Sequence, residues 1–343
     1  MEKGWRGLPY HTIAEHYRRI FGEKVYKIPV TVVDDCPNRM GLKGMKTCSF
    51  CDVWGSAARE ESFTMSLRNQ IEKYQVQIGE EYNSKKFLIY FQAYTNTFTK
   101  VSQLRENFDT ALSYPFVKGF VVGTRPDCLS PAVLNLWQEY NQKSFVAVEL
   151  GVQSFFEPHL IHMRRGHTAN DSLKAIHKIA DTTSVDLGIH LIFGSPNETL
   201  EEIKQTALIC NDLPITNIKL HNLHVLKNTE LERLYNAGEF TAIEREEYTE
   251  RVKVFLSYLH PRIAVHRLAA FASRWEELIS PRWTSDKMGT HQFIIDELRK
   301  SKNYQGCQLH LQSEDDKFLI EKMRLSVERT ESTLPVKAVN FRI

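Results

Sequence analysis

The chain has 343 residues, of which 25% are charged and 42% are hydrophobic, and these ordinary globular values argue against extensive disorder. The formal charge is +2, so bulk charge alone would not hold the protein to nucleic acid, although a local basic face stays open. Six cysteines are too few for a disulfide framework in a chain of this length. No apolar run approaches a membrane span and residues 1–22 lack a secretory signal, so we expect a cytoplasmic protein without membrane contact.

Short apolar runs, rich in β-branched and aromatic residues, alternate with amphipathic segments at a spacing of roughly 30 residues. The predicted strands lie at 25–33, 87–91, 116–122, 145–152, 185–193 and 217–226. The helices predicted between them lie at 66–77, 101–112, 131–140, 170–181 and 200–213. This alternation is typical of βαβ units in a parallel sheet, and periodicity alone leaves a doubly wound sheet and a partial barrel both open.

After residue 226 the pattern changes to helices. Residues 244–259 carry apolar side chains at helical spacing, and a short strand is predicted at 263–268. The charged segment from about residue 308 predicts an amphipathic helix packed on the main domain. We therefore predict an N-terminal helical segment at 1–24, a main α/β domain at 25–230, a C-terminal extension of helices and strand at 231–307, and a charged tail or helix at 308–343.

Three of the six cysteines, Cys36, Cys48 and Cys51, lie in one loop directly after the first predicted strand. Gly41 and Gly44 between them let the backbone wrap closely around a bulky inorganic cluster. Three thiolates with no fourth cysteine nearby predict a cluster or metal site that keeps one position open for chemistry. From the spacing alone, an open iron–sulfur cluster, a zinc site, and inert or redox thiols all stay open as interpretations.

Seven ordered blocks together resemble the radical SAM superfamily and, more narrowly, its YhcC-like family, relatives of the catalytic subunit of Elongator and of oxygen-independent coproporphyrinogen oxidase. The blocks are the cysteine loop with CPNR and C-x-F-C, YFQAYTNTF at 90–98, VGTRPDCL at 122–129, VELGVQSF at 148–155, RRGHT at 164–168, HLIFGSPNET at 190–199 and IKLHNLHVLKNT at 218–229. The resemblance implies a partial (β/α)6 barrel of TIM type with a C-terminal α/β extension. The long gap between the first two cysteines departs from most of the superfamily and is shared by the YhcC-like family.

The resemblance implies that Cys36, Cys48 and Cys51 ligate a 4Fe–4S cluster whose open iron binds S-adenosylmethionine (SAM), and that the reduced cluster cleaves SAM to a 5′-deoxyadenosyl radical. A flavodoxin or ferredoxin is the expected electron donor. The residues expected to bind SAM or to shield the cluster are Phe50, Gln92, Ala93, Tyr94, Thr95, Arg125, Glu149, Gln153, Arg165 and His190.

Several of these residues also have a purely structural interpretation. Arg125 can pair with Asp127 across a loop, Glu149 can pair inside the barrel, and His190 can be a core histidine. Lys219 and His221 belong to a dense group of titratable residues, and strand alternation places both on one face, with His224 on the other unless the strand bends. We predict that Lys219 and His221 contact substrate or transfer a proton, with a solvated strand end as the alternative.

Kinship with the catalytic subunit of Elongator suggests a tRNA wobble uridine side chain as the substrate. A local basic patch for tRNA is predicted from Arg18, Arg19, Lys24 and Lys27 together with Arg262, Arg267 and Arg274. Two alternatives stay open: a radical oxidoreductase acting on a small molecule or peptide, and a zinc-bearing RNA-binding or adaptor protein that makes no radical.

Overall fold

The computed structural model describes residues 5–52, 54, 60–272, 275–311, 314, 316 and 321. Arg274 lies outside these residues, and so does most of the charged segment at 308–343 for which the sequence predicts a helix. Among the described helices, none combines the length and the apolar character that crossing a membrane requires.

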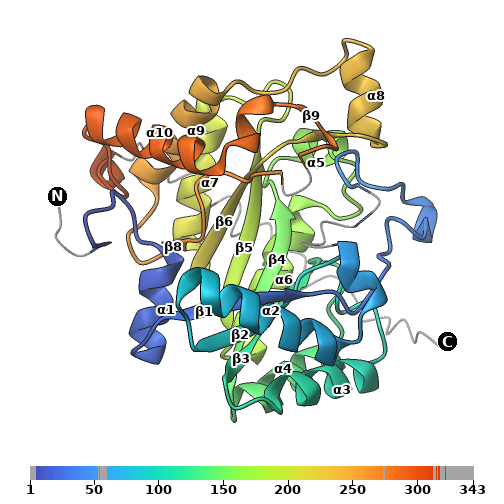
Figure 1. Cartoon of the computed structure of the whole chain (residues 1–343). Helices are drawn as coiled ribbons and strands as arrows, with labels where there is room; N and C mark the ends of the chain where they lie inside the picture. Colours follow the sequence, from blue (N-terminus) through green and yellow to red (C-terminus); the bar gives the residue numbers. More distant parts are fainter. Residues whose placement is uncertain are drawn as a thin grey trace.

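Seven strands form one parallel sheet in the order β1-β2-β3-β4-β5-β6-β8. The bounds are β1 Val25–Val30, β2 Lys86–Phe91, β3 Val117–Thr124, β4 Phe145–Gln153, β5 Asp186–Phe193, β6 Asn217–Asn222 and β8 Ala264–Val265. The sheet curls into a half-barrel with helices on its outside (Figure 1). Because the strand order follows the chain without the reversal of a doubly wound sheet, the predicted partial barrel is confirmed.

The five predicted crossover helices are all present: α2 Leu67–Tyr82, α3 Val101–Leu112, α4 Pro131–Asn141, α6 Ala169–Thr182 and α7 Leu200–Asp212. Side-chain oxygens accept hydrogen bonds from the first turns of α2, α4, α6 and α7, so the sequence itself sets where these helices begin. In α6 and α7 the capping threonines, Thr168 and Thr199, form full capping boxes with Asp171 and Glu202. A short helix that the periodicity does not indicate, α5 Glu157–His162, follows β4.

The remaining elements surround the ends of the barrel. They are α1 Ile13–Phe21, α8 Glu230–Asn236, α9 Arg245–Tyr258, α10 Lys287–Lys300, and a small antiparallel sheet of β7 Val225–Leu226 and β9 Leu278–Ser280. Short 3-10 turns lie at Leu42–Gly44, Glu60–Thr64, Arg282–Ser285 and Leu309–Leu311.

Three predicted strands are clearly shorter in the structure, and the first of them, predicted at 25–33, ends at Val30. The run at 217–226 divides into β6 and β7, because Val225 leaves the barrel sheet and pairs with Ser280 instead. The strand predicted at 263–268 reduces to β8. There the guanidinium of Arg267, and not a strand amide, donates a hydrogen bond to the carbonyl of Leu220 at 3.2 Å, so the ladder ends.

The two faces of the sheet have different surroundings. The outward side chains, such as Phe120, Val148 and Ile189, belong to a large apolar core shared with the helices. On the inward face, a small cluster of Tyr17, Val25, Leu88, Tyr90, Val121 and Ala147 fills the amino-terminal end of the barrel. Above this cluster the inward positions are polar, and they line a cavity that opens toward the carboxyl ends of the strands.

Candidate active site

One cavity of about 1170 Å³ collects nearly all of the predicted site residues. Its lining includes the three loop cysteines, the predicted cofactor residues of β2 to β5 and the polar end of β6. Of the predicted residues, Ala93 alone is missing from this lining: it is fully buried just beyond the end of β2. Residues that lie far apart in the sequence meet here because parallel strands end on the same side of a barrel.

The cysteine loop is held in place by its own polar side chains and by the segment after α5. The Asn38 amide donates hydrogen bonds to the carbonyls of Lys46 and Arg164, at 2.9 and 2.8 Å. The same amide lies 3.4 Å from the Sγ of Cys48 and donates to it. The backbone N–H of Ser49 donates to the carbonyl of Met163 at 3.1 Å. The long gap between the first two cysteines is therefore an ordered loop that is fastened to the barrel.

Arg165 joins the cysteine loop to β4. Its guanidinium donates to the Sγ of Cys48 at 3.3 Å and to the carbonyl of Gly151 at 3.0 Å. Nε2 of His167 accepts from the same guanidinium at 3.2 Å, and burial lowers the pKa of this imidazole to about 3, so it is neutral. No ion pair involves Arg165 in the described part of the chain, which leaves its charge available to a ligand.

Arg125 is committed to protein partners. It forms a two-pronged ion pair with Asp127, at 2.9 and 2.8 Å, and also donates to the side-chain oxygen of Asn38. Gly166 lies against this group: a Cβ there would stand 2.8 Å from the Asn38 oxygen and 2.9 Å from the Arg125 guanidinium. The pairing of Arg125 with Asp127, which the sequence leaves open, is therefore present, and Arg125 also contacts the cysteine loop through Asn38. Its contact with SAM stays a prediction.

The chemistry of these donors fits a cationic cluster and SAM. Burial, followed by the nearby Cys48, Asp52 and Cys36, raises the pKa of the Cys51 thiol to about 12, so this thiol resists ionisation unless a cation compensates the charge. N–H groups already point at the sulfur of Cys48. Oε1 of Gln153 is buried on the cavity wall and has no hydrogen-bond partner among the described residues, as expected of an acceptor that waits for a ligand. In the described part of the chain, no group of three or more His, Cys, Asp or Glu side chains is arranged to hold a single metal ion.

Four other residues that are predicted to contact the cofactors also line the cavity. Gln92, Tyr94 and Thr95 line the cavity at the end of β2, and Tyr94 has a left-handed backbone with φ of +55°. Phe50 lines the cavity and also packs against the apolar cluster that contains Leu160 and Leu231. These positions suit cofactor contacts, and their roles stay predictions.

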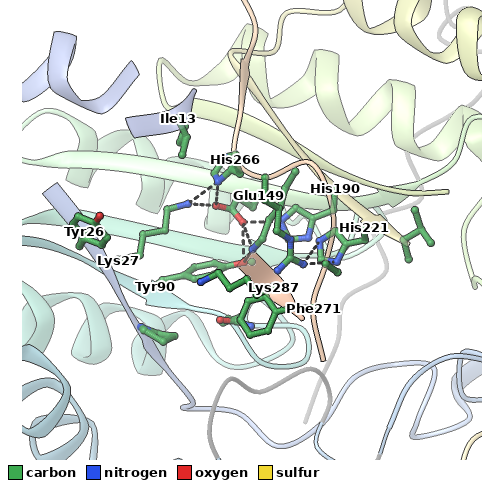
Figure 2. Close-up of a pocket in the computed structure, with 18 of the residues that line it drawn as sticks. Ile13, Tyr26, Lys27, Tyr90, Glu149, His190, His221, His266, Phe271 and Lys287 are labelled. Atoms are coloured by element: carbon green, nitrogen blue, oxygen red, sulfur yellow. Dashed lines mark hydrogen bonds and ion pairs between the residues drawn. The ribbon is translucent and has the colours of Figure 1, made fainter. Parts of the chain in front are cut away.

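Deeper in the barrel, Glu149 is the centre of a polar cluster (Figure 2). Its Oε2 accepts hydrogen bonds from the Tyr90 hydroxyl at 2.8 Å, from His190 at 2.6 Å and from Lys219 at 3.3 Å. Its Oε1 accepts from Lys27. Burial alone would raise the pKa of this carboxyl, but the surrounding cations hold it well below its usual range, and Glu149 is therefore ionised at neutral pH.

Lys219, His221 and His224 all line the cavity, so His224 does not face away from the other two. The reason is that β6 ends at Asn222 and the strand alternation ends with it. Burial lowers the pKa of Lys219 to about 8 and that of His190 and His224 to about 4. Burial and the neighbouring Arg267 hold the pKa of His221 well below its usual range. At pH 7 the lysine is therefore charged and these histidines are neutral.

Sequence reasoning missed several members of the site: Asn38, Tyr90, His167 and His266. A period-two reading of the strands would have found Tyr90, which points inward two residues before Gln92. Of the predicted basic patch, Arg18, Lys24, Lys27 and Arg267 line the cavity, whereas Arg262 donates to the carbonyls of Ile215, Asn211 and Leu213.

Comparisons with known proteins place this geometry in a family. Residues 30–209 match the model of the radical SAM superfamily, and residues 215–300 match that of the Radical_SAM C-terminal domain. Protein YtqA of Bacillus subtilis (strain 168) is 33% identical over 87% of this chain and 92% of its own length. Protein YhcC of Escherichia coli (strain K12) is 33% identical over 85% of this chain and 92% of its own length.

Two more distant matches are to proteins of the archaeon Methanocaldococcus infernus. A tRNA uridine(34) acetyltransferase of Methanocaldococcus infernus is 28% identical over 43% of this chain and 27% of its own length. The structure of the M. infernus Elp3 has a TM-score of 0.63 at 17% identity, over 83% of this chain and 65% of that one, and it shares the fold. The match to the radical SAM family model favours an enzyme over the zinc-bearing adaptor protein. The chain therefore belongs to the radical SAM superfamily, within its YhcC-like family, and is a radical SAM enzyme.

Proposed function

We propose that Cys36, Cys48 and Cys51 hold a 4Fe–4S cluster, that SAM binds beside it in the barrel cavity, and that the substrate is a tRNA carrying a uridine side chain to be modified. When bound, the cluster and SAM would supply a 5′-deoxyadenosyl radical that abstracts hydrogen from the substrate. A flavodoxin or ferredoxin is the proposed source of the electron.

The observation that carries this proposal is the meeting of the cysteine loop and Arg165 at one wall of the cavity. N–H groups of Asn38 and Arg165 donate to Cys48 Sγ, and hydrogen bonds to the cysteine sulfurs are a recurring feature of iron–sulfur sites. The Arg165 charge, which has no carboxylate partner among the described residues, suits a SAM carboxylate. Oε1 of Gln153 is placed to accept a hydrogen bond from a SAM hydroxyl or amine.

The tRNA part of the proposal has its own support. The chain matches a tRNA uridine(34) acetyltransferase over 150 residues. In addition, Arg18, Lys24 and Lys287 line the cavity, and cations there would attract phosphates. These features favour a nucleic acid over an uncharged small molecule.

Anaerobic reconstitution tests the cofactor part. Wild type should bind four irons per chain and release 5′-deoxyadenosine from SAM on reduction, whereas Cys48→Ala should lose the bound cluster and all detectable 5′-deoxyadenosine. Cys307→Ala is the matched control, because Cys307 is a free cysteine outside the cavity lining. One tightly bound zinc with no SAM cleavage would contradict the proposal.

Nucleoside analysis of tRNA tests the substrate part. Cells that lack the gene should accumulate an unprocessed uridine derivative, and complementation with wild type should remove it while complementation with Cys48→Ala should not. An identical nucleoside profile with and without the gene would reject tRNA as the substrate.

A further inference from the structure

The inner end of the cavity carries more positive than negative charge. Lys27, Lys219 and Arg267 line it, and Glu149 is the carboxylate that they face. Asp186, at the start of β5, is occupied by His16 at 2.6 Å. Because the histidines around Glu149 are neutral at pH 7, they add no charge in either direction. Three cations against one anion leave an excess of positive charge, which is costly inside a protein unless a ligand offsets it.

Glu149 cannot offset this excess of positive charge by accepting further hydrogen bonds, because its acceptor sites are already occupied. Its two oxygens already accept from Lys27, Tyr90, His190 and Lys219, which matches the roughly four lone-pair sites of a carboxylate. A second anion is therefore the group that the cluster lacks.

The spare donors belong to Lys219 and Arg267. The ammonium of Lys219 uses two of its three N–H groups, toward Tyr90 at 3.1 Å and Glu149 at 3.3 Å. The guanidinium of Arg267 donates to the Leu220 carbonyl at 3.2 Å and to the His221 ring at 2.7 Å. Among the described residues it has no carboxylate partner, and several of its five N–H groups have no acceptor.

The two side chains come from neighbouring parts of the barrel and face the same space. Lys219 lies on β6, and Arg267 follows β8, which pairs with β6. Arg267 acts on Lys219 electrostatically, since its charge contributes to the lowered pKa of Lys219. The group is also separated from the proposed cluster site. Along β4, Glu149 lies two residues before Gly151, the contact of Arg165, which places it about 7 Å deeper in the barrel.

We propose that Lys219 and Arg267 form a subsite for an anionic group of the substrate, a carboxylate or a phosphate, inside the barrel. This inference rests on the proposed function, because it identifies the substrate as one that carries such a group into the cavity. Glu149 and Tyr90 orient the ammonium of Lys219, and the His221 ring and the Leu220 carbonyl orient the guanidinium of Arg267. An oxyanion between the two would accept charge-assisted hydrogen bonds from both.

The test uses the reconstituted enzyme with SAM, and acetate or inorganic phosphate as the probe. Trace acetylation of Lys219 by an amine-reactive ester, quantified by peptide mass spectrometry, should fall as the anion saturates its site, because a bound anion favours the protonated amine. Lys300, whose side chain is 77% exposed on α10, is the internal control and should keep its reactivity. Protection by acetate alone would indicate a carboxylate, and protection by phosphate alone would indicate a phosphate.

Variants complete the experiment. Arg267→Met should raise the protecting anion concentration by at least about tenfold, as expected for a lost hydrogen bond to a charged group. Arg267→Lys keeps the charge and should recover part of the affinity, which guards against misfolding as the explanation. The subsite is rejected if neither anion protects Lys219 more than Lys300, if Arg267→Met binds as wild type does, or if saturating SAM abolishes the protection.

SAM cleavage measured on the same samples separates this inference from the proposed function. Cleavage without protection would reject the anionic subsite and leave the radical chemistry standing. Protection without cluster or cleavage would reject the radical chemistry and leave the subsite standing.

Discussion

The two faces of the barrel sheet are built from alternate residues of the same strands, and they follow different rules. Outward side chains such as Phe120 and Val148 pack against helices in an apolar core, where contacts are non-directional. Inward side chains such as Glu149 and Lys219 form directional hydrogen bonds with specific polar side chains. The outer face therefore determines whether the chain folds, and the inner face determines what it binds. Substitutions on the two faces should separate stability from cofactor and ligand binding.

The largest effect is expected on the outer face, at Phe120. This side chain is fully buried, and its ring stacks on Phe108 with centroids 4.1 Å apart. Phe120→Ala should lower the free energy of unfolding by about 3–5 kcal/mol, through lost burial and the cavity left behind. Denaturant unfolding under anaerobic conditions measures the loss, and iron content per folded chain should stay at the wild-type value.

Its neighbour Val121 is the matched comparison, because it points to the inward apolar cluster next to Tyr90. Val121→Ala removes fewer atoms and should cost less, about 1–3 kcal/mol. Equal losses for the two variants, or a loss of iron from Phe120→Ala at full folding, would contradict the division between the faces.

How far the sequence predicts this molecule also depends on the face. The apolar runs and the helix caps at Thr168 and Thr199 are local signals, so the strands and the crossover helices were predictable. The partial barrel was not predictable from these signals, and the resemblance to the radical SAM superfamily was needed to choose it over a doubly wound sheet. The three cysteines were predictable as a set because they lie in one loop. The partners of Glu149 were not, because they come from five other places in the chain and meet only when the sheet curls. Spacing cannot report contacts between residues separated by 122 positions, as Lys27 and Glu149 are.

Substitution of Lys219 on the inner face should have an intermediate effect on stability, and this effect should depend on pH. The pKa of this ammonium falls from its usual 10.5 to about 8 in the folded protein, chiefly because of burial. Between these two values the unfolded chain binds more protons than the folded one, so stability rises with pH across this window. The difference in unfolding free energy between wild type and Lys219→Met should therefore grow by about 2–3 kcal/mol in favour of wild type from pH 8 to 10.5.

Denaturant titrations at several pH values measure this difference. Ile161→Met, a substitution at an exposed position that changes no ionisable group, is the control and should differ from wild type by a constant amount across the same range. A flat difference for Lys219→Met as well would mean that the folded protein does not perturb this lysine, and the inner face would then lack the electrostatic character that separates it from the outer one.

The smallest effect on stability is expected at Gly166, where the segment between α5 and α6 touches the cysteine loop. A Cβ at this position would lie 2.0 Å from the sulfur of Met45, besides its close approach to Asn38 and Arg125. The Met45 side chain can move, so Gly166→Ala should cost only about 1–3 kcal/mol through overpacking. Cluster and SAM binding should be reduced more than stability is, because Asn38 donates a hydrogen bond to Cys48 and Arg125 donates one to Asn38. Iron content and SAM affinity after reconstitution should both fall.

Gly238→Ala gives the matched control. A Cβ there meets nothing within 4 Å, while its φ of +72° makes alanine cost about 1–2 kcal/mol in backbone strain. Two variants of similar stability should thus differ in cluster binding, with full iron in Gly238→Ala and reduced iron in Gly166→Ala. If both retained full iron, the cysteine loop would tolerate displacement of Asn38 and Arg125. Its long first gap would then be held by backbone contacts, such as that of Ser49 with Met163, and not by this polar cradle.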